Sequence, residues 1–167
     1  MNRFDMMIAG GMVERFHTGQ TITTRTVGQH TFNMLVIADN VFEGETPDWL
    51  SKAILYHDLH EVFTGDIPWP VKQRPALKEA IDHMEHEINV EYGLTVKLTD
   101  VQYRMLKAID MLEFLLYLMQ ERALGNSNHP ELMDRAADEC HRLLEGDDIA
   151  PFAVGFWRVF TRLLPQI

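Results

Sequence analysis

The chain has 167 residues, of which 46% are hydrophobic, which is enough to fill one core, so we expect a single domain over residues 1–167. It carries 25 acidic against 15 basic residues and a formal net charge of −10, which excludes a general attraction to nucleic acid or to an anionic membrane. With one cysteine, Cys140, it forms no internal disulfide, and a reducing, cytoplasmic compartment fits best. No apolar run reaches the roughly 18 residues of a membrane span.

Apolar residues recur at helical spacing through most of the chain, which predicts an all-α bundle of about seven helices. In chain order, the expected helices cover residues 2–15 (loosened at Gly10 and Gly11), 28–42, 47–63, 75–92 and 100–124, and two more begin at Pro130 and after Pro151. A segment with β-type alternation, LTVKL at 94–98, is too short to carry a sheet.

Residues with known preferences for helix ends mark several of these boundaries. The segment GETP predicts Thr46 as an N-cap, with Pro47 in the first helical position. Thr99 is expected to cap the long helix that follows it, and Gly93 to close the helix before it.

Ionisable side chains interrupt the apolar face of the third expected helix. Positions 54, 57, 58 and 61 share one face of that helix, and three of them hold His57, Asp58 and Glu61. Burial of such groups is costly unless they pair or bind a cation. Asp110 poses the same problem on the fifth expected helix, within the apolar run MLKAIDMLEFLLYLM.

A divalent transition metal is the natural partner for such a set, because neutral imidazoles and carboxylates together suit zinc, manganese, iron or cobalt. Its ligands would come from at least two helices. Each residue taken alone also has an ordinary explanation, as a hydrogen-bonded core residue or a surface group.

Three segments carry a resemblance to a known family: TVGQHTF around His30, YHDLHEVFTGDIPWPVK around His57 and Asp58, and KAIDMLEFLLYL around Asp110. They resemble the HD-domain metal-dependent phosphohydrolases, in the branch that contains the bacterial 5′-deoxynucleotidases and the small phage-type dATP and dNTP triphosphohydrolases. The resemblance covers roughly residues 12–126. It implies a compact HD-domain bundle in which His30, His57, Asp58 and Asp110 bind the metal, and, for a phage-encoded chain, the host cytoplasm as its compartment.

The same resemblance implies catalytic roles for two carboxylates. Glu61 matches the glutamate that handles the attacking water, and a position beside the metal suits a general base. Asp66, in the TGD loop, matches an aspartate at the sugar-phosphate side of the pocket, where it acts as a second acid/base or accepts a hydrogen bond from the deoxyribose. The alternative for Asp66 is a turn residue that satisfies its own backbone.

Substrate contacts are expected from four further residues. Arg15 and Lys72 are candidate cations for the phosphate, and Phe16 is a flat surface against the sugar or base where the family often has Trp. Glu113 lies one turn after Asp110; it is expected to contact the substrate base, to support a metal ligand from behind, or to bind a second metal.

Other conspicuous side chains near these motifs have open roles. His60 faces either substrate phosphate or solvent, and Trp69 either lines the pocket or covers the core. His83 and His86 fit a solvated helix face better than a second metal site.

The leading functional hypothesis is a dNTP triphosphohydrolase, with dATP as its preferred substrate, that releases deoxynucleoside and triphosphate. It depends on the short chain and on potential phosphate contacts from Arg15, Arg25, Lys72 and Arg74. The alternative is a 5′-deoxynucleotidase that acts on dNMPs, and a non-catalytic nucleotide-binding module comes third.

The expected cofactor is Co, Zn or Mn, with Mg as an option for a second ion. The expected partner is a small-molecule deoxynucleotide, with neither nucleic acid nor a membrane. The apolar parts of the fifth and seventh helices favour a homo-oligomer.

Overall fold

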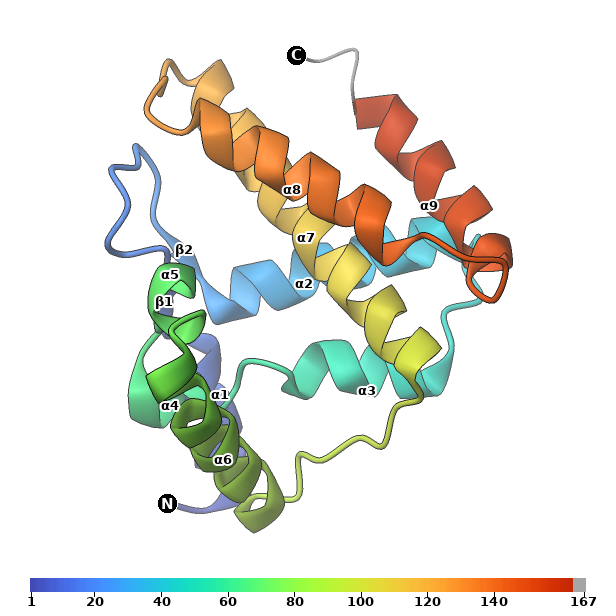
Figure 1. Cartoon of the computed structure of the whole chain (residues 1–167). Coiled ribbons are helices and arrows are strands. Elements are labelled where there is room, and N and C mark those ends of the chain that lie inside the picture. Colours follow the sequence, from blue (N-terminus) through green and yellow to red (C-terminus); the bar gives the residue numbers. More distant parts are fainter. Residues whose placement is uncertain (164–167) are drawn as a thin grey trace.

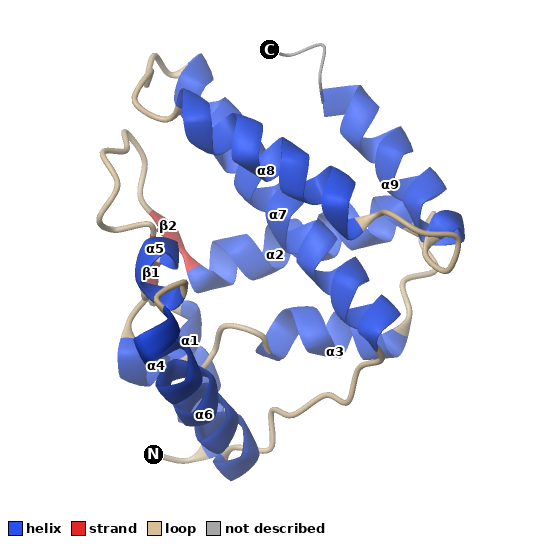
Figure 2. Cartoon of the chain, viewed as in Figure 1, coloured by secondary structure: helices blue, strands red, loops and turns tan. Residues whose placement is uncertain are grey.

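The computed structural model describes residues 1–163, apart from the side chains of Trp69 and Leu163, and helices dominate it (Figure 1). The helices are α1 Arg3–Gly11, α2 Val27–Val41, α3 Asp48–Tyr56, α4 Glu61–Thr64, α5 Trp69–Lys72, α6 Pro75–Glu91, α7 Asp100–Ala123, α8 Pro130–Leu143 and α9 Ala150–Leu163. Figure 2 shows one small sheet, in which β1 Glu14–Arg15 pairs antiparallel with β2 Arg25–Thr26. The predicted all-α fold class is therefore confirmed. Among the described helices, none combines the length and apolar character needed to cross a membrane.

The main hydrophobic core lies between α2, α3, α7, α8 and α9, with the 24-residue α7 running through its centre beside α8 (Figure 1). Ile54, Ile109 and Phe156 are fully buried in it and come from three different helices. Gly155 lies where α9 crosses α2, and a Cβ at this position would collide with the carbonyl oxygen of Val41. The close crossing therefore requires a residue without a side chain.

A second, smaller cluster packs α1 and α6 against the segment that follows α3. Met6, Leu59 and Leu94 form its buried centre, and Ile88 and Tyr92 pack against it. The four-residue turn 57–60, which joins α3 to α4, thus lies between the two clusters. Leu59 points into the smaller one, which leaves its neighbours in the turn free to face elsewhere.

The first expected helix was wrong at its C-terminal end, because α1 stops at Gly11 and not near residue 15. Gly10 and Gly11 at the end of α1 each lie close to the backbone of another segment. A Cβ on Gly10 would lie 2.9 Å from the carbonyl oxygen of Leu59, and a Cβ on Gly28 would lie 2.9 Å from the carbonyl oxygen of Gly11. The chain then extends, and the amide of Val27 donates to the carbonyl of Val13 at 2.8 Å. This extension forms β1.

The third expected helix is divided into α3 and α4, with the turn 57–60 between them, so the prediction of one helix to about residue 63 was wrong. Its N-cap is Pro47, without a side-chain cap bond, and not Thr46. The proline-rich segment also contains the short helix α5. The last helix was expected after Pro151, but α9 begins at Ala150 and includes that proline. The other predicted boundaries agree within one residue, including Thr99, whose side chain forms a capping box with Gln102, and segment 94–98 forms no strand.

The loop between β1 and β2 is anchored on α7 by one buried carboxylate. Glu121, which is 1% exposed, accepts hydrogen bonds from the Ile22 amide at 2.6 Å, the Thr23 amide at 2.9 Å and hydroxyl at 2.5 Å, and Asn126 Nδ2 at 2.8 Å. Burial works against its ionisation, but these hydrogen bonds outweigh burial and lower the pKa of Glu121 to about 2.

We expect the Glu121→Gln variant to lose about 2–4 kcal/mol of unfolding free energy at pH 7, because an uncharged amide accepts more weakly and turns an NH₂ group toward backbone donors. The folded pKa lies below the ordinary value of 4.5, so the carboxylate stabilises the fold fully above pH 4.5 and loses this effect as the pH falls toward 2. Urea unfolding should show the difference between wild type and variant shrinking over that range. The exposed Glu45→Gln change is the control, and a difference independent of pH would contradict the assignment.

Candidate metal and phosphate site

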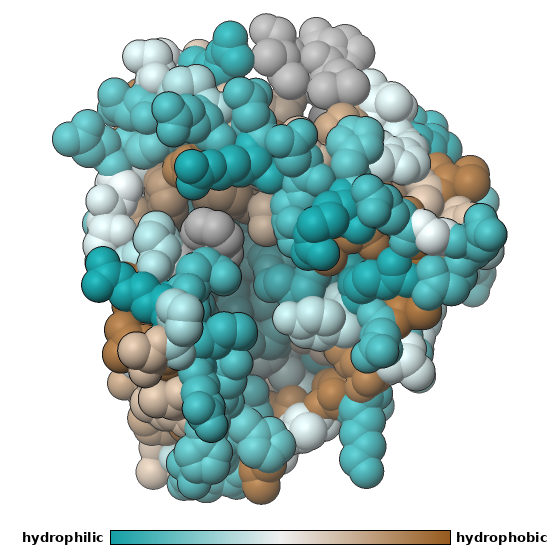
Figure 3. All heavy atoms as spheres, viewed as in Figure 1, coloured by the Kyte–Doolittle hydropathy of each residue, from teal (hydrophilic) through white to brown (hydrophobic). Residues whose placement is uncertain are grey.

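The four residues predicted to bind a metal come from three parts of the chain. His30 lies in the first turn of α2, His57 and Asp58 lie in the turn after α3, and Asp110 lies in the middle of α7. Figure 3 shows this face of the molecule hollowed beside α5 and α6, with hydrophilic residues inside the hollow. Elements distant in sequence thus supply one polar region.

The other three side chains place polar atoms around His30 Nε2. His30 Nε2 lies 3.1 Å from His57 Nε2, 3.6 Å from Asp58 Oδ2 and 3.3 Å from Asp110 Oδ1. His57 Nε2 lies 3.0 Å from Asp58 Oδ2. Bonds of about 2.0–2.1 Å to a tetrahedral or octahedral cation correspond to ligand spacings of about 2.9–3.4 Å. His30, His57 and Asp58 therefore have the mutual spacing of ligands to one ion, and Asp110 lies beside His30.

Hydrogen bonds orient both imidazoles toward this point. His30 Nδ1 lies 2.6 Å from Glu113 Oε2, and His57 Nδ1 lies 2.7 Å from the carbonyl oxygen of Ile54. Both partners only accept, so each Nδ1 carries the hydrogen and the two Nε2 lone pairs face each other. A proton or a metal cation relieves that repulsion. Burial opposes a proton on His57, but the charge of Asp58 outweighs burial and raises the pKa of His57.

Two cations compensate the carboxylates. Arg15 forms an ion pair with Asp58, and Lys107 forms one with Asp110. Burial opposes ionisation of both aspartates, but the positive charges of their partners outweigh burial. Arg15 holds the pKa of Asp58 well below the usual range, and Lys107 does the same for Asp110. Both aspartates are therefore anionic, as metal ligands must be.

Behind His30 lies a buried ion pair that sequence patterns did not indicate. Glu113, 1% exposed, accepts from Arg25 at 2.6 Å and from Asn33 at 3.0 Å in addition to contacting His30. The Arg25 guanidinium lies 4.3 Å from the centroid of the Tyr117 ring. Burial opposes the charged form of Glu113, but its hydrogen-bond partners outweigh burial and lower its pKa. The geometry thus favours support of a metal ligand over substrate contact for Glu113, and Arg25, 5% exposed, is not available to a phosphate.

Glu61 lies between the two predicted phosphate cations. It is 2% exposed, and its Oε1 lies 3.7 Å from Arg15 Nη1 and 4.0 Å from Lys72 Nζ. Its other oxygen, Oε2, has no hydrogen-bond partner among the described residues. Burial and repulsion from Asp58 raise the pKa of Glu61 to about 9; a divalent cation bound at Asp58 would offset that repulsion and lower the pKa, as a general base near neutral pH requires.

Asp66 reaches the same region from the loop after α4. Its Oδ2 accepts from the Phe16 amide at 2.5 Å and lies 3.9 Å from His17 Nδ1. The backbone of Phe16 has a φ of 55°, a left-handed conformation uncommon for a residue with a side chain. Asp66 therefore satisfies the backbone of another segment, and not that of its own turn.

The Phe16 ring packs edge to face against three neighbouring rings. Its centroid lies 5.6 Å from that of Phe114, 6.3 Å from that of Tyr117 and 5.3 Å from that of His129. The predicted contact surface for the sugar or base is thus held by aromatic packing on α7 and at the start of α8.

His60 is buried, with 3% exposure, which rules out the solvent-facing one of its two predicted alternatives. Its Nε2 lies 3.2 Å from Oε1 of Glu85 on α6, and the same oxygen lies 3.2 Å from Lys72 Nζ. Glu85 was not anticipated, since nothing in its helical surroundings marks it. The prediction for Trp69 concerns a side chain outside the described residues. His83 is exposed on α6 as predicted.

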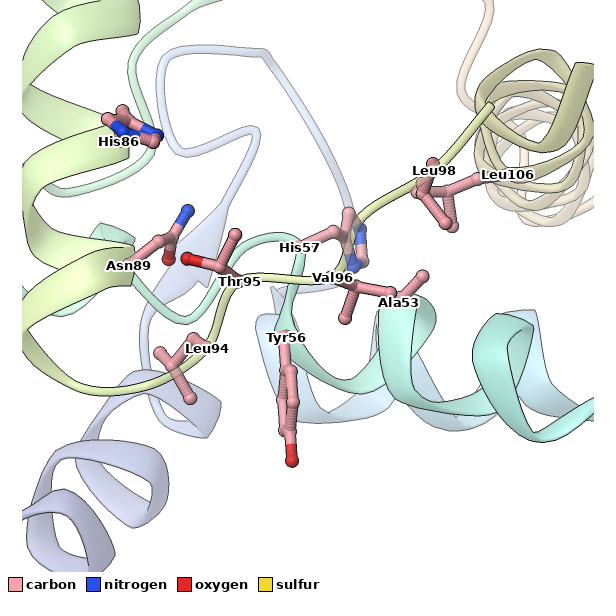
Figure 4. Close-up of a pocket in the computed structure, with 10 residues that line it drawn as sticks. All are labelled: Ala53, Tyr56, His57, His86, Asn89, Leu94, Thr95, Val96, Leu98 and Leu106. Atoms are coloured by element: carbon pink, nitrogen blue, oxygen red, sulfur yellow. The ribbon is translucent and has the colours of Figure 1, made fainter. Parts of the chain in front are cut away.

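A separate cavity of about 160 Å³ lies next to His57, beneath segment 94–98 (Figure 4). Asn89 and Thr95 point toward each other on one side of it, and Ala53 and Val96 make the other side apolar. His57 Nε2, the atom expected to bind the metal, contacts Asp58. We assign no bound molecule to this cavity.

Two of the unanticipated partners did have a signal in the sequence. Lys107 precedes Asp110 by three residues and Asn33 follows His30 by three, and this spacing places each pair on one helix face. Arg25 and Glu85 had no such signal, because their partners are distant in the chain.

Comparison with known proteins agrees with this geometry. The sequence matches the model of the family described as 5′-deoxynucleotidase YfbR-like over residues 4–156. It is similar to the 5′-deoxynucleotidase ECA3034 of Pectobacterium atrosepticum, with 22% identity over 140 residues that make up 70% of each protein. It is also similar to the 5′-deoxynucleotidase PM0747 of Pasteurella multocida, with 26% identity over 84 residues, 45% of this chain. The chain spans 43% of the length of that relative and 43% of the Photobacterium profundum 5′-deoxynucleotidase PBPRA2627.

Among solved structures, the fold resembles that of the cyanophage S-2L HD phosphohydrolase DatZ bound to dA and one catalytic Zn²⁺ ion. The TM-score is 0.76 at 19% identity, and the match covers 100% of this chain and 99% of the phage protein. The compact HD-domain bundle is thereby confirmed. Because the family model spans almost the whole chain and the fold agrees with it, the protein belongs to the YfbR-like 5′-deoxynucleotidase family of HD-domain proteins.

Proposed function

We propose that the protein is a metal-dependent 5′-deoxynucleotidase that hydrolyses 2′-deoxynucleoside monophosphates to deoxynucleoside and phosphate. The observation that carries the proposal is the cluster of His57, Asp58 and Asp110 around His30, with Glu61 nearby between two cations. Curated relatives named 5′-deoxynucleotidases and the dA found in the phage neighbour support a deoxynucleotide substrate.

The monophosphate replaces the triphosphate as the leading substrate. The family and its named relatives favour it. The triphosphate hypothesis also depended on Arg25 as a phosphate contact, and Arg25 is buried against Glu113. Arg15 and Lys72 remain beside Glu61, which is sufficient charge for one phosphate group.

The converging set would hold a divalent transition metal, for which Zn, Co and Mn all suit two imidazoles and two carboxylates. The structure of the phage protein DatZ contains one catalytic Zn²⁺ ion. A cation in this position supplies Lewis-acid stabilisation of phosphoryl oxygens and lowers the pKa of water. In this proposal, Glu113 fixes the tautomer and orientation of His30 from behind.

The remaining side chains bind, orient and move protons. Glu61, whose Oε2 is unengaged among the described residues, accepts the proton of the attacking water as general base. Arg15 and Lys72 hold the phosphate oxygens. Asp66 and Phe16 lie at the sugar side, with Asp66 holding the Phe16 backbone and accepting from the deoxyribose.

A homo-oligomer stays part of the proposal, but on a different surface. The apolar parts of α7 and α9, which suggested it, are largely buried within their own chain, as at Leu112, Leu118 and Phe156. Large apolar side chains are instead exposed on α1, with Phe4 at 72% and Ile8 at 61%. Sedimentation velocity would show a single monomeric species if this face has no partner copy.

A substrate panel tests the proposed reaction. Protein loaded in turn with Zn²⁺, Co²⁺, Mn²⁺ or Mg²⁺ should release inorganic phosphate from dNMPs, act more slowly on ribonucleotides, and lose activity when a chelator removes the metal. Chromatography of the products is the measurement. Tripolyphosphate released from dATP, with no phosphate from dAMP, would restore the triphosphohydrolase hypothesis.

Removal of the proposed base separates an enzyme from a binding module. In the Glu61→Gln variant, we expect kcat to fall at least about 100-fold, because the proton of the attacking water loses its acceptor, whereas metal content by atomic emission stays at the wild-type level. Unchanged turnover would eliminate Glu61 as the base. Absence of turnover in wild type under every metal would favour the non-catalytic module.

The proposed role of Glu113 predicts weaker metal binding. The Glu113→Gln variant should bind Zn²⁺ about 10–100-fold less tightly in a chelator competition assay, because His30 loses the acceptor that orients it. A double variant with Arg25→Met controls for the arginine left unpaired. If Glu113 instead contacts the substrate base, KM rises and metal affinity stays at the wild-type value.

A further inference from the structure

A chain of charged groups extends from the proposed phosphate site into α6. Glu61 Oε1 lies 4.0 Å from Lys72 Nζ, and Lys72 Nζ lies 3.2 Å from Glu85 Oε1. That same oxygen of Glu85 lies 3.2 Å from His60 Nε2. One carboxylate oxygen on α6 therefore contacts both the end of α5 and the turn that carries the HD pair.

The chain is partly shielded from water. The side chains are 4% exposed for His60, 23% for Glu85 and 29% for Lys72, and charges attract each other more strongly here than at a fully exposed surface. Burial opposes ionisation of Glu85, but His60 and Lys72 outweigh burial and lower its pKa. Glu85 is thus a carboxylate at neutral pH, as the contacts require.

Lys72 needs such a partner in order to act on a phosphate. A lysine side chain has many rotamers, and fixing it when a ligand binds costs conformational entropy. Lys72 also ends a helix of four residues, α5, which packs on α6. A contact that restrains the ammonium before the ligand arrives lowers that cost.

We propose that Glu85 is a positioning residue that, together with His60, holds the Lys72 ammonium at the phosphate side of the site. The inference depends on the proposed function, because it takes Lys72 as a contact of the substrate phosphate. Glu85 acts through Lys72, and its role differs from that of an ion pair that only joins α5 to α6.

Kinetics of metal-loaded variants test the inference. Glu85→Gln should raise KM for a dNMP and the inhibition constant of inorganic phosphate roughly tenfold, with kcat changed less than about threefold. Lys72→Met should raise both at least as much. The double variant should match Lys72→Met within about twofold, because two residues that act through one contact are not additive.

Glu79→Gln, an exposed change on the same helix, is the matched control. The inference is overturned if Glu85→Gln behaves like this control, if the effects of the two substitutions add, or if Glu85→Gln lowers Tm and leaves KM unchanged, as loss of a purely structural ion pair would.

Calorimetry with inorganic phosphate separates failure of this inference from failure of the proposed function. Phosphate affinity that falls in both variants of a protein without turnover supports the inference and removes the nucleotidase assignment, whereas absence of phosphate binding in wild type overturns the inference itself.

Discussion

The site depends on the electrostatics of two imidazoles and two carboxylates: His57, Asp58 and Asp110 each place a polar atom 3.1–3.6 Å from His30 Nε2, and His57 Nε2 lies 3.0 Å from Asp58 Oδ2. Facing lone pairs and neighbouring negative charges raise the free energy of such a cluster unless positive charge lies close by. The chain provides it through Arg15 at Asp58 and Lys107 at Asp110. A divalent metal among these donors would meet the same requirement at its centre, and Arg15 would then be free to face a phosphate.

One face of α7 brings the distant parts of the chain to this cluster. Asp110, Glu113, Tyr117 and Glu121 follow one another at spacings of three and four residues, which aligns them along the helix. The last three hold segment 22–25. Glu113 accepts from the Arg25 guanidinium, and the Tyr117 hydroxyl donates to the carbonyl of Thr23. Glu121 accepts from the backbone amides of residues 22 and 23. Because that segment continues into β2, its attachment also places β1 and the arginine at the end of β1.

The break between α3 and α4 is equally important for the geometry. If the helix continued to residue 63, its ionisable residues would remain in one row. The turn 57–60 instead sends Leu59 into the smaller hydrophobic cluster, His60 toward α6, and the HD pair toward α2 and α7. The two clusters of apolar residues on either side of the turn therefore determine where each polar side chain points.

From the sequence, periodicity and capping residues gave the all-α class and most helix boundaries, and polar groups in place of expected core residues marked His57, Asp58, Glu61 and Asp110. The sequence also resembles a family whose motifs added His30 and the expectation that Glu61 and Lys72 lie near these residues. It was insufficient for Arg25 at Glu113, Glu85 at Lys72, the end of α1 and the turn after α3. Each of these depends on a contact between segments far apart in the chain. Local patterns carry no information about which segment will supply the opposite charge or occupy the space beside a glycine, and only the packed tertiary structure decides it.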